Sequence, residues 1–213
     1  VVDFNYYLAY YSITINCVYL LLLIMSFYQV NRQFKKWNMK PKTMLFKNRM
    51  LPSISIIAPA FNEELTIIEN VNSLLNLEYP DYELIIVNDG SIDSTLDKLI
   101  TYFDLKRVDV TYESKLMTKQ VLGIYLNSSI PKLSVIDKMN GGKADSLNAG
   151  INYSKKEYFC GIDADSVLER DALLKLSSLT IDQSRETPAL GGNVYPINGC
   201  VVEKGYISEK HIP

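Results

Sequence analysis

The chain has 213 residues, of which 47% are hydrophobic and 22% are charged; this composition excludes an intrinsically disordered protein and leaves room for one folded domain with an appended segment. The net charge of −2 hides an uneven distribution, because seven of the 22 basic residues lie between Arg32 and Arg49. The part of the chain after Arg49 therefore holds 15 basic and 23 acidic residues, and such an acidic body argues against nucleic acid as a partner.

The first predicted element is a membrane-spanning helix over residues 4–31. These 28 positions contain no charged residue, and a helix needs about 20 apolar residues to cross a bilayer. A signal peptide and a buried core helix remain alternatives, and Asn16 in the middle of the span slightly favours the second. Aromatic residues flank the apolar centre, as they do at both interfaces of membrane helices; they are Tyr6, Tyr7, Tyr10 and Tyr11 at one end and Tyr28, Phe34 and Trp37 at the other.

A basic segment follows at residues 32–51, and we interpret it as a juxtamembrane linker. Positive charges beside a span mark its cytoplasmic side, so we expect a membrane protein with a single N-terminal span and the rest of the chain in the cytoplasm. Such a segment either contacts anionic lipid or is a solvated flank of the span. The three cysteines Cys17, Cys160 and Cys200 are odd in number and widely spaced, which indicates reduced thiols in a cytosolic compartment.

After Pro52, short apolar runs alternate with stretches of helical periodicity, which predicts an α/β domain over residues 52–213. The first strand is expected to end at Pro59, because proline cannot donate to a sheet. Residues 115–130 give no clear signal. The predicted strands are 54–59, 82–87, 108–113, 133–136, 158–162 and 191–196. The predicted helices are 63–77, 91–103, 143–153 and 169–181.

This alternation predicts a mostly parallel sheet covered by helices on both faces. In such sheets, ligands bind outside the carboxyl ends of the strands. Polar residues occur at three of these ends, namely Asn62-Glu63, Asn88-Asp89-Gly90 and Asp163-Ala164-Asp165. We therefore expect the three strand ends to form one binding site rather than three unrelated loops.

The usual phosphate-binding motifs do not occur in the sequence. There is no G-x-G-x-x-G, and Gly142-Lys143 is followed by Ala144 instead of Ser or Thr, which excludes a dinucleotide-binding fingerprint and a P-loop. Two carboxylates one residue apart, Asp163 and Asp165, can hold a hard divalent cation such as Mg²⁺ or Mn²⁺, which would neutralise a pyrophosphate. Spacing alone equally allows them to end the strand and cap the next helix, and Asp89-Gly90 is also a common turn.

Four segments in order resemble the family 2 glycosyltransferases, which have the GT-A fold: residues 57–64 (IAPAFNEE), 87–95 (VNDGSIDST), 140–150 (NGGKADSLNAG) and 162–166 (IDADS). The G-G-K-A-x-x-L-N pattern most resembles the membrane-bound processive synthases of poly-N-acetylglucosamine, cellulose, chitin and hyaluronan. The resemblance covers residues 52–200 and implies a GT-A domain preceded by one transmembrane helix.

The resemblance also implies roles for single residues. The first segment and the Asp of the second contact the nucleoside of the donor, usually uridine. By the same resemblance Lys143 contacts the diphosphate, and Asp163 and Asp165 contact ribose, diphosphate and metal. The residues at the nucleoside-contacting positions are Ala58, Pro59, Phe61, Asn62, Glu63 and Asp89.

The resemblance therefore implies a membrane-anchored, inverting glycosyltransferase with a cytoplasmic catalytic domain. It would use Mg²⁺ or Mn²⁺ and a UDP-sugar donor, of the UDP-N-acetylglucosamine or UDP-glucose type, to extend a polysaccharide or another glycan acceptor. In the reaction of this family, a carboxylate base deprotonates the acceptor hydroxyl, which displaces the nucleoside diphosphate in a single step.

The family's catalytic base and Q-x-x-R-W motif lie beyond the part that the chain matches. The catalytic residue is therefore not assigned, and Glu203 and Glu209 are candidates by position only. We expect a C-terminally incomplete domain, either a fragment or a truncated protein. The alternative is a non-catalytic nucleotide-sugar-binding subunit that lacks the acceptor half. A nucleotidyltransferase is a third hypothesis, but residues 59–62 are not the Gly-rich phosphate loop that it would need.

Overall fold

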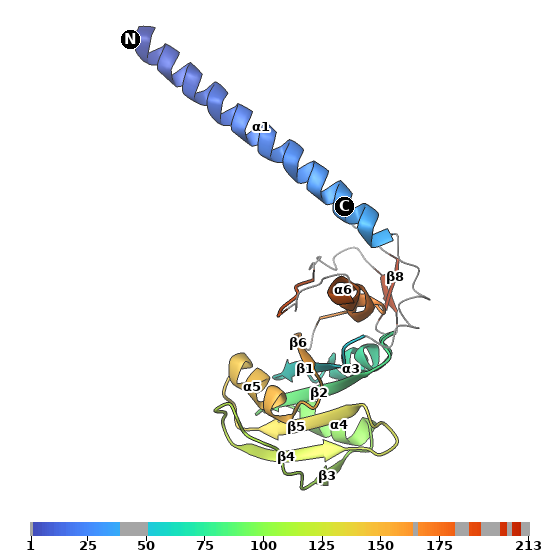
Figure 1. Cartoon of the computed structure of the whole chain (residues 1–213). Coiled ribbons are helices and arrows are strands. Elements are labelled where there is room, and N and C mark those ends of the chain that lie inside the picture. Colours follow the sequence, from blue (N-terminus) through green and yellow to red (C-terminus); the bar gives the residue numbers. More distant parts are fainter. Residues whose placement is uncertain are drawn as a thin grey trace. The chain divides into compact units, whose positions relative to one another are not determined.

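The computed structural model describes residues 2–38, 51–163, 166–181, 188–192, 201–203 and 206–209 (Figure 1). The chain divides into two compact units, Val1–Asn48 and Arg49–Pro213. The first unit contains helix α1 (Val2–Asn38), and the second contains a sheet with its covering helices. Most of the strand predicted at 191–196 lies outside the described residues.

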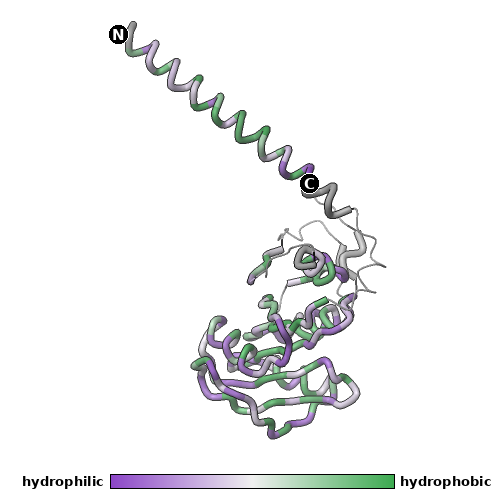
Figure 2. The backbone as a smooth tube through the Cα atoms, viewed as in Figure 1, coloured by the Kyte–Doolittle hydropathy of each residue, from purple (hydrophilic) through white to green (hydrophobic). Residues whose placement is uncertain are grey.

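Helix α1 is, by length and composition, long and apolar enough between Phe4 and Arg32 to cross a membrane. Its exposed side chains include the apolar run Leu20–Ile24. Because consecutive helical residues point in different directions, this run makes the helix apolar all round rather than along one stripe. Figure 2 shows hydrophobic residues on successive turns of α1. The helix therefore covers residues 4–31, for which the membrane-spanning helix is predicted.

The second unit is built on a six-stranded sheet with the order β3-β4-β5-β2-β1-β6. Strands β5, β2, β1 and β6 are parallel, and β4 and β3 extend the sheet as an antiparallel edge. The predicted α/β class with a mostly parallel sheet is confirmed. The strands of this sheet are β1 (Ile54–Ala60), β2 (Tyr82–Asp89), β3 (Lys106–Val108), β4 (Val121–Leu126), β5 (Leu133–Lys138) and β6 (Tyr158–Gly161). A separate antiparallel pair consists of β7 (Val201–Glu203) and β8 (Tyr206–Glu209).

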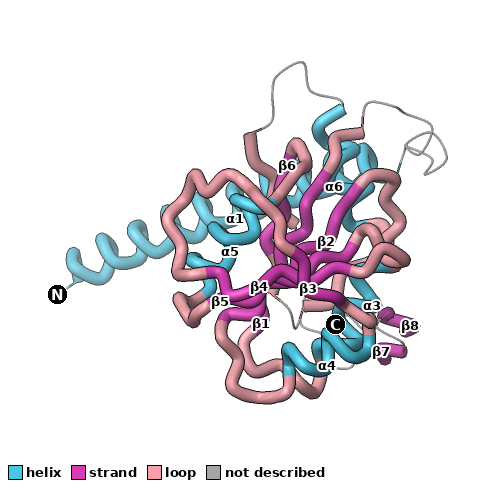
Figure 3. The backbone as a smooth tube through the Cα atoms, turned by 90° about the horizontal axis from the view of Figure 1, so that it is seen from below, coloured by secondary structure: helices cyan, strands magenta, loops and turns pink. Residues whose placement is uncertain are grey.

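Helices cover both faces of this sheet, as Figure 3 shows from below. On one face, Ala149 of α5 packs into a buried cluster with Ile57, Ile85 and Ile136 from three strands. Side chains alternate between the two faces along a strand, so the fully buried Ile56 points to the opposite face, where α3 and α4 lie. The helices of the unit are α3 (Ile67–Leu75), α4 (Thr95–Tyr102), α5 (Lys143–Tyr153) and α6 (Ala172–Ile181).

The antiparallel edge corrects two expectations. The strand predicted at 108–113 is wrong, because β3 ends at Val108 and residues 109–120 form a loop. The stretch 115–130, which gave no signal, contains strand β4. Its residues (VLGIYL) are apolar on both sides of Gly123, and a glycine inside a strand weakens the strand signal.

Helices α3 and α4 begin later than predicted, and the loops before them explain why. The backbone N–H of Asn62 donates to Ser91 Oγ (3.0 Å), and the N–H of Ile92 donates to Asn62 Oδ1 (3.0 Å). The next pair repeats the exchange, since the Glu64 N–H donates to Asp93 and the Ser94 N–H donates to Glu64. These residues therefore join the two loops instead of forming first helical turns.

Gly150 lies where α5 crosses β1. A Cβ atom there would lie 2.3 Å from Cγ2 of the buried Ile57. We expect Gly150→Ala to lower the free energy of unfolding by about 1–3 kcal/mol, the usual cost of overpacking a core. Gly161→Ala is the control, since its Cβ would meet only the flexible Leu147 side chain, at 3.1 Å. Chemical denaturation compares the two variants, and equal midpoints would contradict the packing argument.

Candidate functional site

The carboxyl ends of the parallel strands surround a pocket of about 210 Å³. Residues from the ends of β1 and β2, the first turn of α5 and the end of β6 contribute to it, although these segments are far apart in the sequence. The prediction that polar strand ends meet at one edge of the sheet agrees with this geometry. The lining residues are Pro59, Ala60, Phe61, Glu63, Asp89, Lys143 and Asp163.

Three of the predicted site residues stand apart from this lining. Ala58 is fully buried inside β1. Asn62 has a positive φ of 57° and uses its side chain to hold the N–H of Ile92, so it joins the two loops beside the pocket. Asp165 lies outside the described residues. Ala60 lines the pocket without having been predicted, although it lies within the first motif segment.

Asp89, at the end of β2, is the most enclosed acid of the pocket, with only 4% of its surface exposed. Its Oδ1 accepts hydrogen bonds from Lys138 Nζ (2.5 Å) and the Gly141 N–H (2.9 Å), and its Oδ2 accepts from the Gly142 N–H (2.7 Å). Burial raises the pKa of Asp89, but these hydrogen bonds outweigh burial and hold the pKa below its ordinary value. The carboxylate is therefore ionised at neutral pH.

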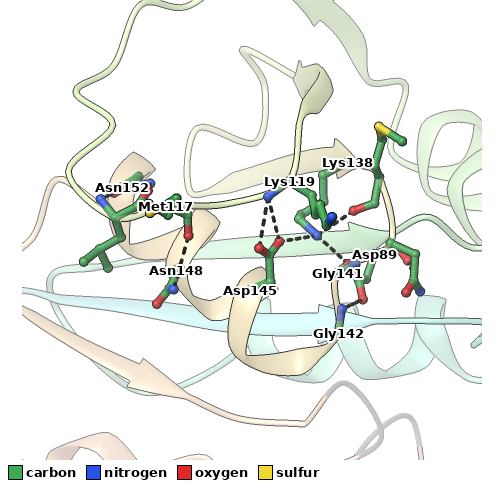
Figure 4. A network of polar contacts seen from close by, with 12 residues as sticks. Asp89, Met117, Lys119, Lys138, Gly141, Gly142, Asp145, Asn148 and Asn152 are labelled. Carbon is green, nitrogen blue, oxygen red and sulfur yellow. Dashed lines mark hydrogen bonds and ion pairs between the residues drawn. The ribbon is translucent and has the colours of Figure 1, made fainter.

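Lys138, which the sequence analysis missed, is fully buried beside this acid. Its ammonium lies between Asp89 (2.5 Å) and Asp145 (2.7 Å) and also donates to the Met139 carbonyl oxygen. Figure 4 shows Lys138 at the centre of a polar network that runs from the pocket to helix α5. Asp89 and Lys138 are register partners on β2 and β5, which is a signal that only the strand pairing supplies.

The turn before α5 packs closely against the end of β2. Gly90 has a φ of +66°, and a Cβ atom there would lie 2.7 Å from the backbone nitrogen of Asn140. Asn140 Nδ2 donates to the Asp89 carbonyl oxygen (2.8 Å). Asp89 is the last residue of β2 rather than part of a turn. Gly90 is required here because its φ is positive and the chain passes close to Asn140.

Lys143 is the first residue of α5, and its ammonium forms an ion pair with Asp163 across the pocket. Both side chains remain more than half exposed, so each is accessible to a ligand. The alternative that Asp163 caps the next helix is wrong, because α6 begins only at Ala172. The pocket thus brings a lysine and an aspartate together at the end of β6.

The mixed six-stranded sheet between two helix layers, with its pocket at the carboxyl ends of the parallel strands, agrees with the GT-A fold expected from the resemblance. A family model described as glycosyl transferase family 2 matches residues 55–186. The chain belongs to this family, and the resemblance noted from its four motif segments is confirmed.

Similar curated proteins include polysaccharide synthases. The chain is 28% identical over 190 residues to the poly-β-1,6-N-acetyl-D-glucosamine synthase of Staphylococcus epidermidis, covering 88% of this chain and 38% of that protein. It is 32% identical over 158 residues to the chondroitin synthase of Pasteurella multocida, covering 73% of this chain and 14% of that protein. The chain therefore spans well under half the length of these relatives.

A solved structure with a similar arrangement is the mannosyltransferase PcManGT from Pyrobaculum calidifontis in complex with GDP-Man and Mn²⁺. It aligns with a TM-score of 0.49 and 19% sequence identity. The alignment covers 73% of this chain and 40% of that chain.

Proposed function

We propose that this pocket binds a UDP-sugar together with Mg²⁺ or Mn²⁺, and that the chain is the donor-binding part of a membrane-anchored, inverting polysaccharide synthase. The observation that carries the proposal is the pocket lining, in which the four motif segments of the family each contribute a residue. Membership of glycosyl transferase family 2 supports the reaction class.

The residues of the pocket suit the parts of such a donor. Phe61 is about half exposed and offers an aromatic face to the nucleoside. Lys143 supplies a positive charge to the diphosphate, which would replace Asp163 as its partner. Asp163 is then available, with Asp165, as an oxygen ligand for a divalent cation. When bound, this cation would stabilise the leaving diphosphate.

The donor sugar and the location follow from separate arguments. The similarity to poly-β-1,6-N-acetyl-D-glucosamine synthase favours UDP-N-acetylglucosamine over UDP-glucose. Helix α1, followed by the basic residues from Arg32 to Arg49, favours a membrane anchor with the pocket in the cytoplasm. The sugar acceptor would be the growing glycan.

Calorimetric titration of the full chain, purified in detergent, tests donor binding. UDP is expected to bind more tightly with Mn²⁺ than without it. Asp165→Ala should remove that increase, because the variant loses one of two carboxylate ligands. Asp171→Ala, outside the pocket, is the control and should keep the increase.

The outcomes separate the parts of the proposal. A folded parent chain that binds no UDP would rule out the donor site. Retained metal dependence in Asp165→Ala would rule out the metal assignment.

A further inference from the structure

Helix α5 carries a polar stripe that faces the loop before β4. The stripe consists of Asp145, Asn148 and Asn152, whose spacing of three and four residues places them on one side of the helix. They hold the backbone of residues 115–119, here called the strap (Figure 4). The Lys119 N–H donates to Asp145 (3.0 Å), Asn148 donates to the Met117 carbonyl (3.4 Å), and Asn152 both accepts from and donates to Leu116 (2.9 and 2.8 Å).

Asp145 differs from the two asparagines because it also contacts the buried ammonium of Lys138. Its Oδ2 lies 2.7 Å from Lys138 Nζ, and that same ammonium lies 2.5 Å from Asp89. The Lys138 side chain is 0% exposed and that of Asp145 is 19% exposed, so water screens this interaction little. An unbroken series of polar contacts therefore joins Asp145, on α5, to an acid of the pocket.

The same series ends on the turn that precedes Lys143. Asp89 holds the N–H groups of Gly141 and Gly142, the last residues before α5. Asp145 packs against this turn from the other side, because a Cβ atom on Gly141 would lie 2.6 Å from Asp145 Cγ. The turn is thus fixed between two carboxylates that share one lysine.

We propose that Asp145 is a positioning residue, which acts through Lys138 and Asp89 to fix the Gly141-Gly142 turn and so the ammonium of Lys143. This inference rests on the proposed function, in which Lys143 binds the diphosphate of the donor. A lysine held in place before binding loses less conformational freedom when the diphosphate arrives. Asp145 contributes to donor affinity in this way without touching the donor.

A double-mutant cycle tests the inference with the full chain in detergent, UDP as the ligand and Mn²⁺ present. Asp145→Asn keeps the volume and an acceptor oxygen but removes the charge that holds Lys138. It is expected to weaken UDP binding about tenfold in the parent and less than twofold in a Lys143→Ala background. The free-energy effects of substitutions within one contact network are not additive. Equal losses in both backgrounds would overturn the positioning role.

Hydrogen–deuterium exchange of the ligand-free chain gives a second readout that does not depend on UDP. Amides of residues 139–142 are expected to exchange faster in Asp145→Asn, because local opening of the turn becomes easier. Asn152→Ala is the matched control, because Asn152 lies on the same helix and binds the strap but does not contact Lys138. This variant should change neither the exchange of residues 139–142 nor the affinity for UDP. Unchanged exchange in Asp145→Asn would overturn the inference.

Gly141→Ala provides a second route if Asp145→Asn does not fold, because its Cβ would push Asp145 aside. The same Lys143-dependent loss of affinity is expected, and a loss independent of Lys143 would refute the inference. A parent chain that binds no UDP while Asp145→Asn speeds exchange at the turn would refute the proposed function instead. The two failures are therefore distinguishable.

Discussion

Replacing Lys138 by methionine is expected to lower the free energy of unfolding by about 3–5 kcal/mol, the usual cost of removing one partner from a buried ion pair. The Lys138 side chain is 0% exposed and lies within 2.7 Å of both Asp89 and Asp145. Methionine would fill a similar space but leave two enclosed carboxylates without their shared cation. Denaturant titration at pH 7, followed by circular dichroism, measures the loss.

A matched pair of substitutions separates burial from charge. Lys156 makes an ion pair of similar length with Asp81 (2.6 Å), but these side chains are 26% and 58% exposed. Lys156→Met should cost less than about 1 kcal/mol, because solvent weakens an exposed pair. A triple variant that combines Lys138→Met, Asp89→Asn and Asp145→Asn removes all three charges. It should recover part of the free energy of unfolding that Lys138→Met alone loses. Equal losses for the two lysines would show that Lys138 contributes no more than a surface charge.

The loss in Lys138→Met should also depend on pH, with a sign that follows from Asp89. In the parent, the pKa of Asp89 is below its ordinary value of 3.8, so its ionised form stabilises the fold above about pH 4, and this stabilisation disappears as pH falls through the lowered pKa. Lys138 is the largest of the causes that lower this pKa, so the pKa of Asp89 is expected to rise when Lys138 is replaced. The folded variant then gains from protonation, so its deficit should shrink from pH 7 toward pH 4. A constant deficit would contradict this assignment.

Lys138 illustrates what the sequence could not show. A lysine that follows Leu133–Ile136 is usually a solvated residue at a strand end, and nothing local distinguishes this one. Its burial depends on the pairing of β2 with β5, which places it opposite Asp89. That pairing is a long-range property, whereas hydrophobic periodicity reports only local order.

The elements that were predicted correctly are those that the local sequence determines. The strand at 54–59 and the helix at 143–153 were predicted almost to the residue, because β1 is buried on both faces and α5 begins at a glycine turn. Helices α3 and α4 were predicted too long, because the residues before them exchange hydrogen bonds across two loops. The pocket was predicted from the polar strand ends, because parallel strands deliver their carboxyl ends to one edge.

Asp89→Ala is expected to weaken UDP binding about 100-fold, or roughly 2.8 kcal/mol. Two losses contribute under the proposed function. The nucleoside loses the acid assigned to it, and a hydrogen bond to a charged group contributes about 1.5–3 kcal/mol. The N–H groups of Gly141 and Gly142 also lose their acceptor, which frees the turn that presents Lys143. Calorimetry of the full chain with UDP and Mn²⁺ measures the change.

The control for this loss is Asp81→Ala, which removes an acid just before the amino end of β2, away from the pocket, and should leave UDP affinity within twofold. Comparing UDP with UDP-N-acetylglucosamine then locates the lost contact. If Asp89 binds the nucleoside part, both ligands should lose affinity equally, because they share it. If only the sugar-bearing ligand weakens, the nucleoside assignment is wrong and Asp89 lies nearer the transferred sugar. If neither weakens in a folded variant, the pocket at the end of β2 is not the donor site.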